Sequence, residues 1–98
     1  MRVHIIGICG TFMGGVARLA KETGHDVSGS DANTYPPMST QLESLGVALC
    51  EGYSADNIPA DVDLVVVGNT ISRGNPELEA VLNQGLAYTS GAQWLSEH

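Results

Sequence analysis

The sequence passes three times from a helical pattern, through a single glycine, directly into an apolar run. The glycines of these passages are Gly24, Gly46 and Gly85. Glycine ends a helix readily because it adopts a left-handed backbone conformation without a steric penalty. Helices that alternate with strands in this rhythm are typical of right-handed β-α-β units built on a parallel sheet.

The spacing of apolar residues predicts where these elements lie. Strands are expected at residues 3–8, 26–30, 47–50, 62–67 and 86–89. Helical spacing covers residues 13–20, 38–45 and 76–84, and Asn75 followed by Pro76 is a typical helix start. Residues 52–61 have no clear period and are expected to be a connection, whereas residues 93–98 look like the start of another helix.

The length of 98 residues fits one domain, residues 1–98. Hydrophobic residues make up 43% of the chain and aromatic residues only 5%, so the core must consist mainly of Val, Ile, Leu and Ala. We therefore expect an α/β fold of the Rossmann-like kind, with three layers and a parallel sheet of about five strands flanked by helices. The abrupt final helix indicates a fragment of a larger protein.

Charge and composition exclude several classes of function. A net charge of −7 with only four basic residues argues against nucleic-acid binding, which depends on clustered Lys and Arg. No apolar run has the length of a membrane span, and the apolar start is too short for a signal peptide. The isolated Cys9 and Cys50 suit free thiols in a reducing cytoplasm.

Neither a metal site nor a catalytic residue is expected in this chain. His4, His25 and His98 lack the spacing of metal ligands and are expected to be structural or solvated. Cys9 lies close to a predicted helix start, which can lower the pKa of a thiol, but no base stands near it in the sequence.

The turn GICGTFMGG at residues 7–15 joins the first predicted strand to the first helix. Unpaired N–H groups and the positive end of a helix dipole favour a phosphate group at such a place. Gly7 and Gly10 would permit the tight turn and the close approach of the ligand. Cys9 and Phe12 replace the second and third glycines of the dinucleotide motif, and packing of helix on sheet is the alternative role for the glycines.

Polar residues follow two other predicted strands at the same edge of the sheet. Asp31 stands where an acidic side chain commonly accepts a ribose hydroxyl, although it could equally stabilise its own turn. Asn69, Thr70, Ile71 and Arg73 follow the fourth strand, at the carboxyl edge where open α/β sheets bind ligands. Arg73 is also consistent with a solvated surface charge.

Three linked motifs resemble the N-terminal domain of the Mur ligase family over essentially the whole chain. They are GICGTFMGG at residues 7–15, GSDANTYPPMST at 29–40 and RGNP at 73–76. The alanine-adding members usually carry glycine in place of Cys9 and Phe12, so the resemblance is greater to the murein peptide ligases of cell-wall recycling.

This resemblance implies a cytoplasmic enzyme that uses ATP and Mg²⁺ to join L-alanyl-γ-D-glutamyl-meso-diaminopimelate to UDP-N-acetylmuramate. The chain contains no G-x-x-x-x-G-K-[ST] sequence, so it should bind the UDP-sugar without catalysing ligation and needs no cofactor of its own. The resemblance implies pyrophosphate contacts to the backbone of Gly10, Thr11, Phe12 and Met13. It implies weaker contacts to the uridine end from Asp31, Asn69, Thr70, Ile71 and Arg73.

Two other classes of function remain open from the sequence. The glycine turn and Asp31 also suit an NAD-binding domain of an oxidoreductase or a regulatory protein. A Rossmann-like scaffold can also serve as an interaction module without any nucleotide, because a fold does not determine a function.

Overall fold

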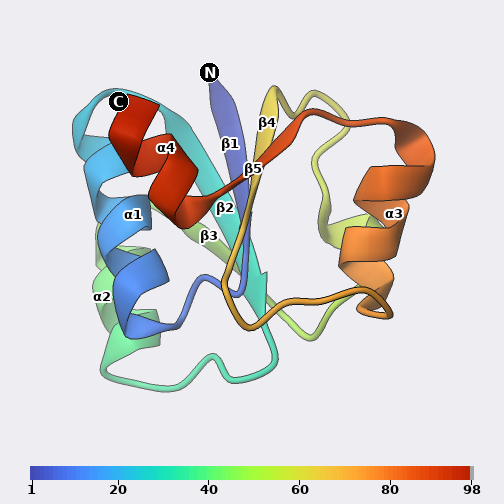
Figure 1. Ribbon diagram of the computed structural model, residues 1–98. Helices are drawn as coiled ribbons and strands as arrows, with labels where there is room; N and C mark the ends of the chain where they lie inside the picture. The colour runs from blue at the N-terminus through green and yellow to red at the C-terminus, as the bar shows by residue number, and fades with distance from the viewer. Residues whose placement is uncertain (98) are drawn as a thin grey trace.

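The computed structural model describes residues 1–97, so His98 lies outside the described residues. Strands alternate with helices along the chain (Figure 1). The strands are β1 (Arg2–Ile6), β2 (Asp26–Asp31), β3 (Ala48–Glu51), β4 (Leu64–Val67) and β5 (Tyr88–Ser90). The helices are α1 (Thr11–Glu22), α2 (Met38–Ser44), the 3₁₀ helix η1 (Ala55–Asn57), α3 (Pro76–Gln84) and α4 (Gly91–Glu97).

The five strands form one parallel sheet in the order β3-β2-β1-β4-β5. All carboxyl ends therefore meet at one edge, the lower edge of the sheet in Figure 1. The strand order reverses beside β1, where the chain continues from β1 to α1 on one face and from β4 to α3 on the other. Such a reversal opens a crevice between the loops that follow the two strands.

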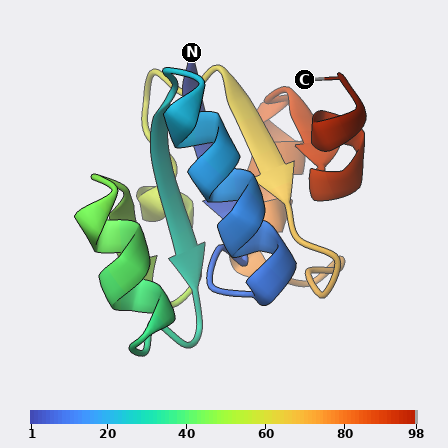
Figure 2. The ribbon, with the colours of Figure 1, turned by 90° about the vertical axis from the view of Figure 1, so that its left-hand side faces the viewer.

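Helices cover both faces of the sheet, which confirms the three-layer α/β fold. Helices α1, α2 and α4 lie on one face, and α3 with η1 lies on the other (Figure 1). Figure 2 shows α1 in front of the sheet, between α2 and α4. Ile5, Val16 and Val66 belong to the larger apolar cluster under α1, and Trp94 of α4 is fully buried in it. A smaller cluster around Ile6, Val65 and Val81 lies under α3.

The predicted elements exist, but three strand boundaries were wrong by two residues, and several others were wrong by one. The strand predicted at 3–8 ends at Ile6 because Gly7 turns the chain with φ +84°. The strand predicted at 62–67 begins at Leu64, since the N–H of Val62 closes a turn onto the carbonyl of Pro59. The strand predicted at 86–89 begins at Tyr88, because the N–H of Leu86 bonds to the end of α3.

A buried carboxylate at the start of α3 connects four parts of the fold. Glu77 is fully buried, and its Oε2 accepts hydrogen bonds from His4 Nε2 at 2.6 Å and Ser30 Oγ at 2.7 Å. Its Oε1 accepts bonds from the N–H of Ser54 at 3.1 Å and from Asn57 Nδ2 at 2.7 Å. The carboxylate thereby joins α3 to β1, β2 and η1. His4 is structural, as expected.

These hydrogen bonds determine the charge state of Glu77. Burial by itself raises the pKa of the carboxyl, but the bonds from His4, Ser30, Asn57 and Ser54 together hold the pKa below its usual value. The first turn of a helix also favours a negative charge. Glu77 is therefore a fully hydrogen-bonded anion in the core, and such groups are costly to leave without partners.

Replacing Glu77 by alanine should destabilise the domain strongly, because it leaves two buried and two partly buried donors without their acceptor. We expect the free energy of unfolding to fall by about 3 kcal/mol in urea titrations followed by circular dichroism. Glu79→Ala on the same helix is the control, since Glu79 pairs with the exposed Arg73 and should have a much smaller effect. Equal effects of the two variants would contradict the role given to Glu77.

The stability supplied by Glu77 should depend on pH in the acid range. Its folded pKa lies below the usual 4.5, so the unfolded chain takes up the proton first as the pH falls. This stabilisation is therefore fully present above pH 4.5 and is lost as the pH falls through the folded pKa. Unfolding titrations of the wild type and Glu77→Gln between pH 7 and pH 3 should converge towards low pH. A difference that stays constant over this range would contradict the assignment.

Candidate functional site

The glycine turn after β1 is held in place by backbone bonds to β2. The N–H groups of Gly7 and Ile8 both donate to the carbonyl of Ser30, at 2.8 and 3.1 Å. Gly7 has φ +84°, and a Cβ there would lie 3.2 Å from Cγ1 of Ile71. The turn can therefore pass close to the loop after β4 only because residue 7 is glycine.

The first turn of α1 presents free hydrogen-bond donors at the carboxyl edge of the sheet. Gly10 is the N-cap, with extended φ/ψ and no side chain to cap the helix, and the first bond of the helix runs from Gly14 N–H to its carbonyl at 2.7 Å. Within residues 1–97, the N–H groups of Thr11, Phe12 and Met13 have no acceptor. These groups and the helix dipole form a site for an anion.

Asp31 connects the loop after β2 to the glycine turn. Its Oδ2 accepts the N–H of Cys9 at 3.0 Å, and its Oδ1 accepts the N–H of Asn33 at 3.0 Å. The second bond closes the local turn that was expected as the alternative to ligand contact. Each carboxylate oxygen of Asp31 thus already accepts a bond from the backbone on one side of the crevice.

The segment after β4 lies at the carboxyl edge of the sheet. Asn69 and Thr70 are exposed there, half-buried Ile71 packs against Gly7, and both Asn69 and Ile71 line one cavity together with Arg73. Arg73 is bound to Glu79, with Nε–Oε2 and Nη2–Oε1 distances of 2.6 and 3.2 Å. The hydrogen bonds to Glu79 raise the pKa of the Arg73 guanidinium and neutralise its charge locally. A cavity of about 380 Å³ beside Arg73 opens on the α3 side, between β5 and α3.

Cys9 does not have the environment of a reactive thiol. Partial burial, together with the nearby negative charge of Asp31, raises the pKa of the Cys9 thiol, so the neutral form dominates at pH 7. Over residues 1–97, no three His, Cys, Asp or Glu side chains come together in an arrangement suited to a metal ion. None of the helices in the same range has both the length and the apolar character needed to cross a membrane.

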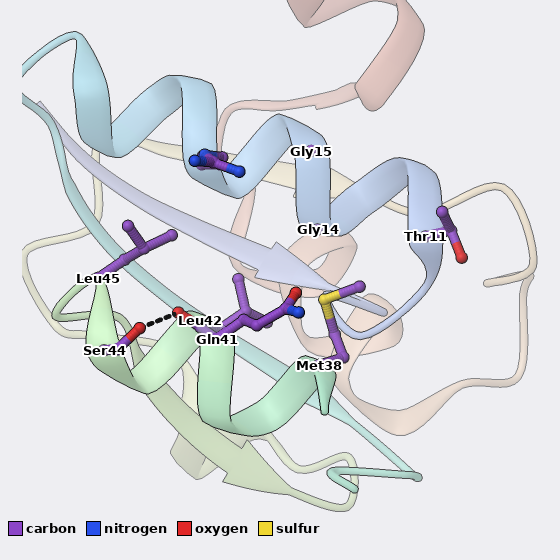
Figure 3. Close-up of a pocket in the computed structure, with 9 residues that line it drawn as sticks. Thr11, Gly14, Gly15, Met38, Gln41, Leu42, Ser44 and Leu45 are labelled. Carbon is purple, nitrogen blue, oxygen red and sulfur yellow. Dashed lines mark hydrogen bonds between the residues drawn. The ribbon is translucent and has the colours of Figure 1, made fainter. Parts of the chain in front are cut away.

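A separate groove of about 450 Å³ lies on the outer face, between α1 and α2 (Figure 3). Met38, Leu42 and Leu45 line it from α2, and Gly14 and Gly15 line it from α1. A Cβ at Gly14 would lie 2.8 Å from the sulfur of Met38, so a larger residue there would require the Met38 side chain to move. Only Thr11 is shared between this groove and the anion site at the sheet edge.

Sequence reasoning missed the backbone groups that shape the site. The carbonyl of Ser30 and the N–H of Cys9 carry no signal in the residue types, since every residue has these groups. The pairing of Arg73 with Glu79, six residues later, was equally unforeseen. A basic and an acidic residue at that spacing, across a helix start, would have been the only hint.

Comparison with known proteins identifies the family of the chain. A family model described as "Mur ligase family, catalytic domain" matches residues 2–98. The UDP-N-acetylmuramate–L-alanyl-γ-D-glutamyl-meso-2,6-diaminoheptandioate ligase of Escherichia coli is 58% identical over 97 residues, which are 99% of this chain and 21% of that enzyme.

Solved structures give the same result for the fold. A murein peptide ligase from Psychrobacter arcticus superposes with a TM-score of 0.96 at 58% identity, covering 100% of this chain and 20% of that one. A UDP-N-acetylmuramate–alanine ligase from Thermotoga maritima gives a TM-score of 0.90 at 28% identity, covering 99% of this chain and 22% of that one. The chain spans about a fifth of the length of the curated relatives it matches. By the family match over residues 2–98, it belongs to the Mur ligase family.

Proposed function

We propose that this chain is the UDP-N-acetylmuramate-binding N-terminal domain of a cytoplasmic, ATP-dependent ligase. The whole enzyme would join L-alanyl-γ-D-glutamyl-meso-diaminopimelate to the lactyl carboxylate of the UDP-sugar, in peptidoglycan recycling. Identity of 58% to a relative named for this reaction supports the proposal.

The observation that carries the proposal is the open first turn of α1. The backbone N–H groups of Thr11, Phe12 and Met13 are suited to bind an anion. Gly10 is exposed, so an anion has room to approach them. We place the pyrophosphate at Gly10, Thr11, Phe12 and Met13, beside Gly7. We place the uridine end in the crevice bordered by Asp31, Asn69, Thr70 and Ile71, with Arg73 at its outer end.

The domain would contribute binding and orientation to the reaction. Holding the UDP end fixes where the lactyl carboxylate points, and such positioning can supply several kcal/mol, about 7 or more in favourable cases. ATP and Mg²⁺ have no fitting residues among 1–97, which include neither a P-loop lysine nor a cluster of carboxylates. We assign both to the remaining four-fifths of the enzyme, where they would activate the carboxylate.

An NAD-binding domain is the second candidate, because the strand order and the acidic residue at the end of β2 suit it. Two features count against it. Cys9 occupies the position of the second motif glycine, and both oxygens of Asp31 already accept backbone bonds.

Calorimetric titration of the chain with UDP-N-acetylmuramate, and separately with NAD, tests the proposal directly. We expect heat from the UDP-sugar alone, because Cys9 replaces the second glycine of the dinucleotide motif and both oxygens of Asp31 already accept backbone bonds. Both titrations are run at the same salt concentration and without ATP, so that the heats of the two ligands can be compared directly. Binding of NAD alone would replace the ligase proposal by the dinucleotide one.

A side chain at Gly10 should block the phosphate without unfolding the domain. A Cβ at Gly10 would meet only the carbonyl of Gly7, at 3.7 Å, so Gly10→Val fits the fold. We expect this variant to raise the Kd for UDP-N-acetylmuramate by at least about a hundredfold, because the anion must approach the backbone closely.

Gly15→Val is the matched control, since a Cβ at Gly15 meets nothing within 4 Å and lies on the outer groove of the same helix. The affinity of the Gly15→Val variant for UDP-N-acetylmuramate should equal that of the wild type. Unchanged affinity in a folded Gly10→Val variant would place the phosphate elsewhere.

A further inference from the structure

The geometry points to Asp31 as a positioning residue: its carboxylate shapes the phosphate-binding turn through the N–H of Cys9 and is not itself the ligand of the ribose. This inference rests on the proposed binding of a UDP-sugar at the first turn of α1. It assigns Asp31 a different means of action from the direct contact that its place at the end of β2 suggests.

The first step of the argument is the geometry of the carboxylate. Oδ2 of Asp31 accepts from Cys9 in the turn after β1, and Oδ1 accepts from Asn33 in the loop after β2, both at 3.0 Å. One carboxylate thus holds two loops that belong to different strands. An ionised carboxylate suits this role because both of its oxygens are acceptors.

The second step is the position of the Cys9 N–H relative to the phosphate donors. Cys9 stands immediately before Gly10, the N-cap whose helix presents the free N–H groups of residues 11–13. The preceding residues, Gly7 and Ile8, are held by the carbonyl of Ser30. The turn is therefore fixed to β2 at three consecutive N–H groups, and Asp31 supplies the one nearest to the phosphate donors.

The third step separates positioning from electrostatics. A negative charge beside an anion site weakens anion binding by Coulomb repulsion alone, so removing it should strengthen binding. If Asp31 instead holds the donors in place, removing its charge should weaken binding. Asn at this position can accept only one of the two N–H groups, because its amide nitrogen is a donor. The two roles therefore predict effects of opposite sign.

The test compares Asp31→Asn with Asp26→Asn in the 98-residue chain. Asp26 stands at the other end of β2, about 16 Å away at 3.3 Å per residue, so its variant removes the same charge far from the site. The probes are UDP and inorganic pyrophosphate, titrated by NMR, with the amide spectrum reporting that each variant is folded. Pyrophosphate has neither ribose nor base, so it senses only the phosphate donors.

We expect Asp31→Asn to weaken pyrophosphate and UDP by a similar factor, about tenfold, which is the size of one lost charge-assisted hydrogen bond. Asp26→Asn should leave both affinities unchanged or slightly stronger. Weaker UDP binding with unchanged or stronger pyrophosphate binding would overturn the inference, because it would make Asp31 a direct ligand of the nucleoside. A wild type that binds neither probe would instead refute the proposed function, and with it the positioning role.

A measurement on the wild type keeps the inference testable if Asp31→Asn does not fold. The bond predicts a scalar coupling between the Cys9 amide nitrogen and the side-chain carboxyl carbon of Asp31. We expect this coupling in the free chain and in the presence of pyrophosphate. Its absence in both states would overturn the inference.

Discussion

The fold depends on a single buried carboxylate. Glu77 accepts four hydrogen bonds from three different parts of the chain outside its own helix. Loss of its carboxylate would leave all four donors without this acceptor. Ser30 is one of the donors, and its carbonyl in turn holds the glycine turn. Ser30 thus links the buried carboxylate of Glu77 directly to the turn that carries the anion site.

The two long helices that begin at the carboxyl edge, α1 and α3, differ in whether the chain itself supplies acceptors for the N–H groups of the first turn. In α3, Asn75 Oδ1 accepts the N–H groups of Glu77 and Leu78, at 3.0 and 3.1 Å. In α1, Gly10 offers no side-chain oxygen, and the first N–H groups remain free among the residues described. An uncapped start lowers helix stability. Its occurrence where the sheet order reverses is consistent with the proposal that an external anion accepts these N–H groups.

The sequence predicted the layers and both ends of α3 because these depend on local patterns. Apolar spacing located α1, and Asn75 with Pro76 located the start of α3, both properties of a few neighbouring residues. The role of Glu77 could not be foreseen, since an acid in a first turn usually interacts with the dipole at the surface. Its burial follows from His4, 73 residues away, and no local pattern expresses such a contact. The strand ends shifted for a local reason, because Gly7 turns the chain after β1 and the N–H groups of Val62 and Leu86 bond within short turns.

At the proposed pyrophosphate site this acidic chain offers no free arginine, and its one lysine, Lys21, stands in the last turn of α1, at the opposite end from the open N–H groups. Each arginine is paired with a carboxylate: Arg2 with Asp61, Arg18 with Glu22, and Arg73 with Glu79. Recognition therefore falls to backbone N–H groups, whose partial charges act only at short range and whose directions are set by the fold. This explains why the site depends on how the turn is held, by Ser30 and Asp31, more than on any basic side chain. Removing side chains at the site therefore tests it poorly, whereas adding atoms at Gly10 or releasing the turn at Asp31 tests it directly.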